Sequence, residues 1–95
     1  MRKVTVNRPQ KMKLPFSKGK ILLNNNEHEI VKAGKTVTFE IPDGYHDIQV
    51  VFAAVPPVTS NALRIDTMDG DTIFEVKINV PLNADLPTEA VLTRV

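Results

Sequence analysis

The sequence lacks cysteine and tryptophan and contains four glycines among its 95 residues. Without cysteine, neither a disulfide framework nor a thiolate metal site can form. Phosphate-binding and dinucleotide-binding loops need several closely spaced glycines, which this chain does not have. Recognition of bases and sugar rings uses exposed aromatic side chains, and one tyrosine with four phenylalanines offers little to either ligand. We therefore expect no cofactor.

Long apolar runs are also missing. No stretch approaches the roughly 18–20 apolar residues that a membrane-spanning helix needs. The residues after Met1-Arg2-Lys3 lack the apolar run of a signal peptide. We expect a cytoplasmic protein with no membrane span, and a domain cut from a larger or surface protein would show the same pattern.

The residues that are abundant favour strands. Valine, isoleucine and threonine together number 27, whereas leucine and alanine number 13. Branched side chains pack well on a pleated sheet, whereas leucine and alanine favour helices. A chain of this length has room for a single core, so residues 1–95 are expected to form one β domain.

From Lys20 to Val80, apolar residues alternate with polar ones in short runs between turn residues, and no helical period occurs, whereas residues 86–90 could form a helical turn. The alternation predicts an inward face made of Ile48, Val50, Phe52, Phe74, Val76 and Ile78. Runs of this kind, spaced 8–12 residues apart, are typical of an antiparallel immunoglobulin-like β-sandwich of about seven strands. A small, partly open β-barrel is the alternative. We expect the core in residues 20–80, after a basic segment at 1–19 and before a tail at 81–95.

Turn residues predict how the strands connect. Pro42-Asp43-Gly44 and Asp69-Gly70 are each expected to close a β-hairpin, the second through a type I′ turn with positive φ. Residues 53–60 show no period and are expected to form a surface loop. Residues 12–16 alternate as a short edge strand would, and residues 91–95 could add to a sheet edge.

Positive charge is concentrated at the start of the chain. Seven basic residues and no acidic ones precede Glu27. The candidate basic patch consists of Arg8, Lys11, Lys13, Lys18 and Lys20. Such a segment can bind a nucleic acid or another polyanion, or it can be an edge made soluble by lysine. The poverty of exposed aromatics makes nucleic acid the less favoured partner.

The loop at residues 53–58 is unusually apolar for a surface segment. Four of its residues are candidate partner contacts, namely Val55, Pro56, Pro57 and Val58. Tyr45 is a fifth candidate, outside the loop. A loop of this composition suits contact with another chain, and it equally suits capping the end of its own sandwich.

Candidates for chemistry are sparse. His28 and His46 lack a third residue at the spacing of a zinc motif. The acidic residues around Asp69 do not follow the order of ligands in a calcium loop. Neither serine, Ser17 nor Ser60, lies in the sequence context of a nucleophile. We expect no metal site and no enzymatic activity.

The order of strands and turns also resembles a known family. The matching residues are Lys20–Leu23, Gly34, Thr36–Ile41 and Gly44-Tyr45-His46. They resemble the small β-sandwich modules named for a Pro-Glu-Gly-Ala tetrapeptide (PEGA modules), although that tetrapeptide is absent here. The resemblance implies a non-catalytic scaffold or adhesion-like module. The sequence therefore favours a structural or protein-interaction module, which contacts another chain or a second copy, with polyanion binding as the alternative.

Overall fold

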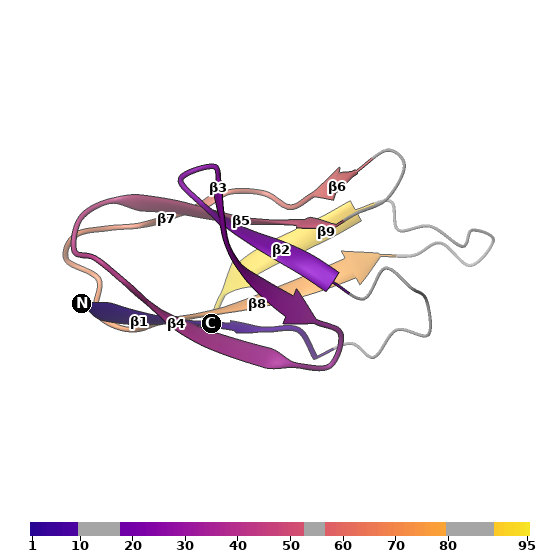
Figure 1. Cartoon of the computed structure of the whole chain (residues 1–95), viewed down its shortest axis with the longest axis horizontal. Helices are drawn as coiled ribbons and strands as arrows, with labels where there is room; N and C mark the ends of the chain where they lie inside the picture. Colours follow the sequence, from indigo (N-terminus) through magenta and orange to yellow (C-terminus); the bar gives the residue numbers. More distant parts are fainter. Residues whose placement is uncertain (10–17, 53–56, 80–88) are drawn as a thin grey trace.

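The structure is a computed structural model and describes residues 1–9, 18–52, 57–79 and 89–95. The described residues contain strands and turns and no helix. Figure 1 labels the strands, which are β1 (Arg2–Asn7), β2 (Lys18–Leu23), β3 (Asn26–Lys32), β4 (Thr36–Ile41), β5 (His46–Phe52), β6 (Val58–Thr59), β7 (Leu63–Ile65), β8 (Thr72–Asn79) and β9 (Glu89–Arg94).

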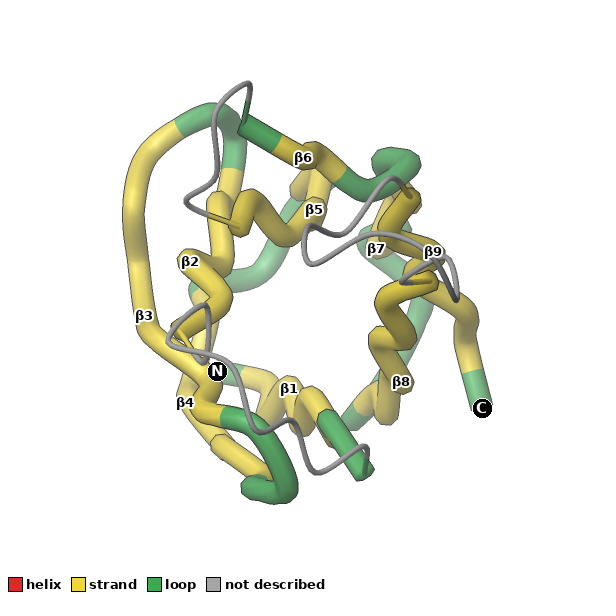
Figure 2. The backbone as a smooth tube through the Cα atoms, turned by 90° about the vertical axis from the view of Figure 1, so that its right-hand side faces the viewer, coloured by secondary structure: helices red, strands yellow, loops and turns green. Residues whose placement is uncertain are grey.

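The strands form two sheets. The first sheet has the order β4-β1-β8-β9. The second has the order β3-β2-β5-β6, and β7 also pairs with β5. Viewed along the long axis, β3 and β4 lie next to each other where the sheets meet on one side (Figure 2). On the other side, β6 contacts β9. The expected all-β sandwich is confirmed.

One pairing departs from the antiparallel expectation. β1 lies between β4 and β8, and it runs antiparallel to β4 but parallel to β8. The first residues of the chain are thus an inner strand of a sheet rather than a separate basic segment. Val4 and Val6 of β1 and Leu92 of β9 are buried in the core. The core is therefore not confined to residues 20–80.

The core fills the space between the sheets, and its predicted centre is confirmed. The six residues expected to face inward are at most 3% exposed: Ile48, Val50, Phe52, Phe74, Val76 and Ile78. They alternate with exposed or half-buried residues along β5 and β8. Because side chains of a strand alternate between its two faces, this burial follows directly from the sequence period.

Both predicted hairpins are wrong. The turn at Pro42–Gly44 leads from β4 in the first sheet to β5 in the second. The turn containing Asp69-Gly70 leads from β7 in the second sheet to β8 in the first, and Gly70 does not adopt positive φ. The buried guanidinium of Arg2 explains this geometry, because it donates to backbone carbonyls of both turns. The acceptors are Pro42, Gly44, Asp66 and Asp69.

Other local expectations have mixed outcomes. Asn24 and Asn25 adopt left-handed φ of 54° and 67° in the turn between β2 and β3, as asparagine readily does. The predicted loop at 53–60 contains the short strand β6 instead. β9 adds to the edge of the first sheet, as expected for residues 91–95. The expected strand at 12–16 lies outside the described residues.

No helix in the described part of the chain is long and apolar enough to cross a membrane.

Candidate functional site

The sheets meet along two seams, and one of them is bridged by hydrogen bonds. Asn61, between β6 and β7, donates from Nδ2 to the carbonyl of Leu92 on β9 over 2.9 Å. Its Oδ1 accepts the Leu92 amide over 2.8 Å. The side chain therefore acts as a peptide group would in a ladder. Beside it, the Ser60 hydroxyl accepts the Val50 amide of β5 over 2.8 Å. We call this junction the bridged seam.

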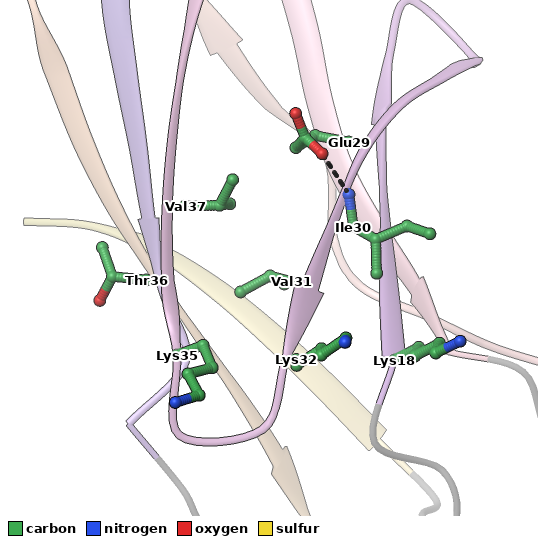
Figure 3. Close-up of a pocket in the computed structure, with 8 residues that line it drawn as sticks. All are labelled: Lys18, Glu29, Ile30, Val31, Lys32, Lys35, Thr36 and Val37. Carbon is green, nitrogen blue, oxygen red and sulfur yellow. Dashed lines mark hydrogen bonds between the residues drawn. The ribbon is translucent and has the colours of Figure 1, made fainter.

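The second seam lies between β3 and β4, and we call it the open seam. These two edge strands are joined by a short turn but are not paired. The rings of His28 and Phe39 span the seam with centroids 4.7 Å apart. Nearer the turn is a groove of about 500 Å³, shown in Figure 3. Its lining consists of Lys18, Glu29, Ile30, Val31, Lys32, Lys35, Thr36 and Val37.

Arg8 fixes the turn end of this groove from inside the protein. Its side chain is fully buried, and the guanidinium lies 4.7 Å from the ring centroid of Phe52. The guanidinium donates to the Val31 carbonyl over 3.3 Å, and the Arg8 amide donates to the Lys35 carbonyl over 2.9 Å. Burial lowers the pKa of Arg8, because a low dielectric disfavours the charged form. Arg8 thus ties the end of β3 to the turn that follows it.

Three exposed lysines surround the groove, and we call Lys18, Lys32 and Lys35 the lysine cluster. Lys18 on β2 and Lys32 on β3 are directly opposite each other in the strand register. Figure 3 shows these two side chains extending in the same direction, with Lys35 on the β4 side of the groove. Val31 belongs to the sandwich core, Val37 packs against it, and both line the groove. The groove therefore offers positive charge beside an apolar surface.

The predicted basic patch does not assemble as the sequence suggested. Arg8 is buried inside the sandwich and cannot contact an external phosphate, because its position under Phe52 excludes it from the surface. Lys20 lies 3.9 Å from the carboxylate of Glu27, and Lys18 lines the groove. Lys11 and Lys13 lie outside the described residues. Sequence reasoning missed Lys32, which the strand register places opposite Lys18, and Lys35, which lies after β3 and lines the same groove.

The predicted partner-contact residues are also separated. Tyr45 precedes β5, and Val58 pairs with Phe52 at the far end of that strand, about 20 Å away at the usual rise per residue. Tyr45 is 66% exposed, and Arg64 lies 5.3 Å from its ring centroid. Pro57 is exposed and Val58 half-buried. Val55 and Pro56 lie outside the described residues.

The histidines serve local contacts. His46 bonds to the Pro42 carbonyl over 2.8 Å and to the Asn24 side chain over 3.0 Å, and it holds the turn before β5. His28 contacts Phe39 across the open seam. Within the ranges that the structure describes, no three His, Asp or Glu residues are grouped so that they could hold a metal ion.

The carboxylate of Asp69 is held by an ion pair and by hydrogen bonds. Its carboxylate receives both terminal nitrogens of Arg94, each over 3.1 Å. The hydrogen bond from Arg94, and then that from the Asp66 amide, lower the pKa of Asp69. The same hydrogen bond raises the pKa of Arg94. This pair fastens the turn before β8 to the end of β9.

The geometry thus singles out the open seam. There the outer edges of β3 and β4, which no other described strand pairs with, coincide with an apolar floor and the lysine cluster. Comparison of the chain with protein families, curated proteins and solved structures finds no match.

Proposed function

We propose that this protein is a non-enzymatic interaction module that binds an extended segment of another protein along the open edge of β3. The proposal rests on the difference between the two seams. Asn61 satisfies backbone groups at the bridged seam, whereas β3 and β4 meet without pairing at the open seam. An unpaired edge presents backbone donors and acceptors to any strand that approaches it.

Ile30 marks the point where an added strand would bond. Its amide donates to the carboxylate of its own neighbour, Glu29, over 3.3 Å. This contact is long, and its acceptor belongs to β3 itself rather than to β2. The Ile30 side chain is 38% exposed, although it is a large apolar residue. A partner strand would give this amide a backbone acceptor and cover the side chain.

The chemistry around the groove suits binding. Its lining provides ammonium groups, aliphatic side chains, a carboxylate and a hydroxyl. Charge and apolar contact give affinity and orientation to a ligand. Polyanion binding is supported less well, because the groove lining contains no aromatic side chain for base stacking. Two members of the predicted basic patch, Arg8 and Lys20, are already occupied by contacts within the protein.

The test is a selection of random displayed peptides against the protein, followed by hydrogen exchange on the complex. We expect bound peptides to slow exchange of the Ile30 amide. Ile30→Pro, which removes that amide at an edge position, should weaken binding while Ile30→Thr retains it. Circular dichroism establishes that both variants fold. Peptides that bind Ile30→Pro as well as the parent would overturn the proposal, and so would dimerisation through β3 in sedimentation experiments.

A further inference from the structure

We infer that the lysine cluster is an anion subsite, and that the partner segment carries acidic residues alternating with an apolar one. This inference rests on the proposed function, because it names the partner of the same open seam. Its first support is the strand register. Lys18 and Lys32 are directly opposite each other, and like charges at such positions destabilise a sheet.

No ion pair offsets this repulsion within the described part of the chain, although the Glu29 carboxylate lines the same groove. None of the three lysines forms an ion pair with a described residue, whereas other lysines do. Lys20, two residues along β2 from Lys18, faces Glu27 at 3.9 Å. Lys77 faces Glu75 at 3.4 Å. Lys20 and Lys77 therefore each have a carboxylate close by, whereas the three lysines of the cluster do not, and an anion bound between them would relieve the repulsion.

The backbone that carries the cluster is held in place before any ligand arrives. The buried Arg8 side chain bonds the Val31 carbonyl, next to Lys32, and the Arg8 amide bonds the Lys35 carbonyl. The Lys35 amide in turn donates to the Lys32 carbonyl over 3.1 Å. A site whose backbone is already fixed loses less conformational freedom on binding.

The apolar floor specifies the pattern of the partner. Side chains of an added strand alternate between the two faces of the sheet. Those on the outer face would lie beside Lys32, with the long side chain of Lys18 in reach. The residue between them would point into the seam, toward Val31 and Val37. An acidic-apolar-acidic segment of a protein fits both requirements.

The test compares three blocked synthetic peptides, which alternate glutamate with valine, glutamine with valine, and glutamate with serine. We expect the Glu-Val peptide to bind about tenfold or more tightly than either other peptide, and its affinity to fall as ionic strength rises. Hydrogen exchange should show protection of the Ile30 amide by the same peptide.

Lys32→Glu gives a decisive variant. It replaces a repulsive pair with an attractive one opposite Lys18, so the urea midpoint should stay the same or rise while Glu-Val binding is lost. The variant should instead accept a peptide that alternates lysine with valine. Lys77→Glu, which makes the same charge change in the other sheet, should leave binding intact. Binding retained in Lys32→Glu would overturn the inference.

The outcomes separate the two proposals. Equal binding of the Glu-Val and Gln-Val peptides, lost in both cases with Ile30→Pro, would overturn the anion subsite and support strand addition. Binding by none of the three peptides, together with no enrichment in the display selection, would overturn both proposals. Tighter lysine-dependent binding of oligothymidylate than of the Glu-Val peptide would replace the protein partner with a nucleic acid.

Discussion

Gly19 on β2 permits a close approach between a backbone and a ring. It pairs with Phe52 of β5, and a Cβ atom at this position would lie 2.8 Å from a carbon of the Phe52 ring. The same Cβ would lie 2.9 Å from a methyl group of Val50. Both neighbours are fully buried, so neither can move aside easily. Glycine is needed here for space rather than for an unusual φ.

We predict that Gly19→Ala lowers the free energy of unfolding by about 1–3 kcal/mol, because overpacking in a close-packed core forces side chains from their preferred rotamers. Urea denaturation provides the measurement. Gly70→Ala is the matched control, since an added Cβ there meets no atom within 4 Å, and its unfolding midpoint should hardly change. Equal effects of the two substitutions would show that the contact with Phe52 is not tight.

The burial of a residue was predictable only where apolar and polar residues alternate along a strand. The alternation along β5 and β8 identified the inward side chains correctly, because a strand has two faces and one of them is apolar. The same reasoning failed for Arg8. Its charge suggested exposure, and its burial depends on Phe52 and on the Val31 carbonyl, which are far from it in the sequence. The lysine cluster was missed for the same reason.

Single side chains can join or separate whole strands. Asn61 joins the segment between β6 and β7 to β9 through two hydrogen bonds to the same residue, Leu92. Among the described residues, no side-chain amide joins β3 to β4 in this way, and the ring contact of His28 with Phe39 is a weaker restraint on the backbone. The sandwich is thus fastened along one side and accessible along the other.

We predict that Asn61→Leu lowers the free energy of unfolding by about 1–3 kcal/mol, because it leaves the Leu92 amide and carbonyl without their partners. Asn61→Asp should give a smaller loss, since a carboxylate still accepts the Leu92 amide but repels the carbonyl. Hydrogen exchange should show faster exchange at Leu92 in both variants. Unchanged exchange at Leu92 would contradict the bridging role.

The connections between strands show what turn residues can and cannot predict. Pro-Asp-Gly and Asp-Gly marked turns correctly, because these residues favour tight changes of direction. They did not reveal that each turn passes from one sheet to the other. That route is set by Arg2, whose guanidinium holds carbonyls of both turns, and no local pattern connects Arg2 with them.

At the scale of the whole molecule, an ion pair joins two segments at one end of the first sheet. Arg94 at the end of β9 binds Asp69 in the turn before β8 through both terminal nitrogens.

The fold class was predictable because it depends on composition and on the period of the strands. The order of strands within each sheet was not, because long-range pairings such as β1 with β8 leave no local signal.

The lowered pKa of Asp69 predicts how stability changes in acid. A carboxyl whose pKa is lower in the folded state contributes stability above its unfolded pKa of about 4, and that contribution is lost as the pH falls through the folded value. Urea denaturation from neutral pH to pH 3 should therefore show a steeper loss of stability below pH 4 in the parent than in Asp69→Asn.

Glu40→Gln removes an exposed carboxyl from β4 and is the control for that series. It should retain the acid dependence of the parent. A parent-like acid dependence in Asp69→Asn would show that the pair with Arg94 contributes nothing to stability.

The position of β1 inside the first sheet has a consequence for the order in which the chain folds. β2 and β3 are neighbours in the sequence and can pair as soon as both exist. β1 must wait for β4 on one side and for β8, near the other end of the chain, on the other. Long-range pairings of this kind raise the contact order and slow folding. During synthesis on a ribosome, Val4 and Val6 therefore emerge well before β8, and one side of β1 stays unpaired until β8 has followed.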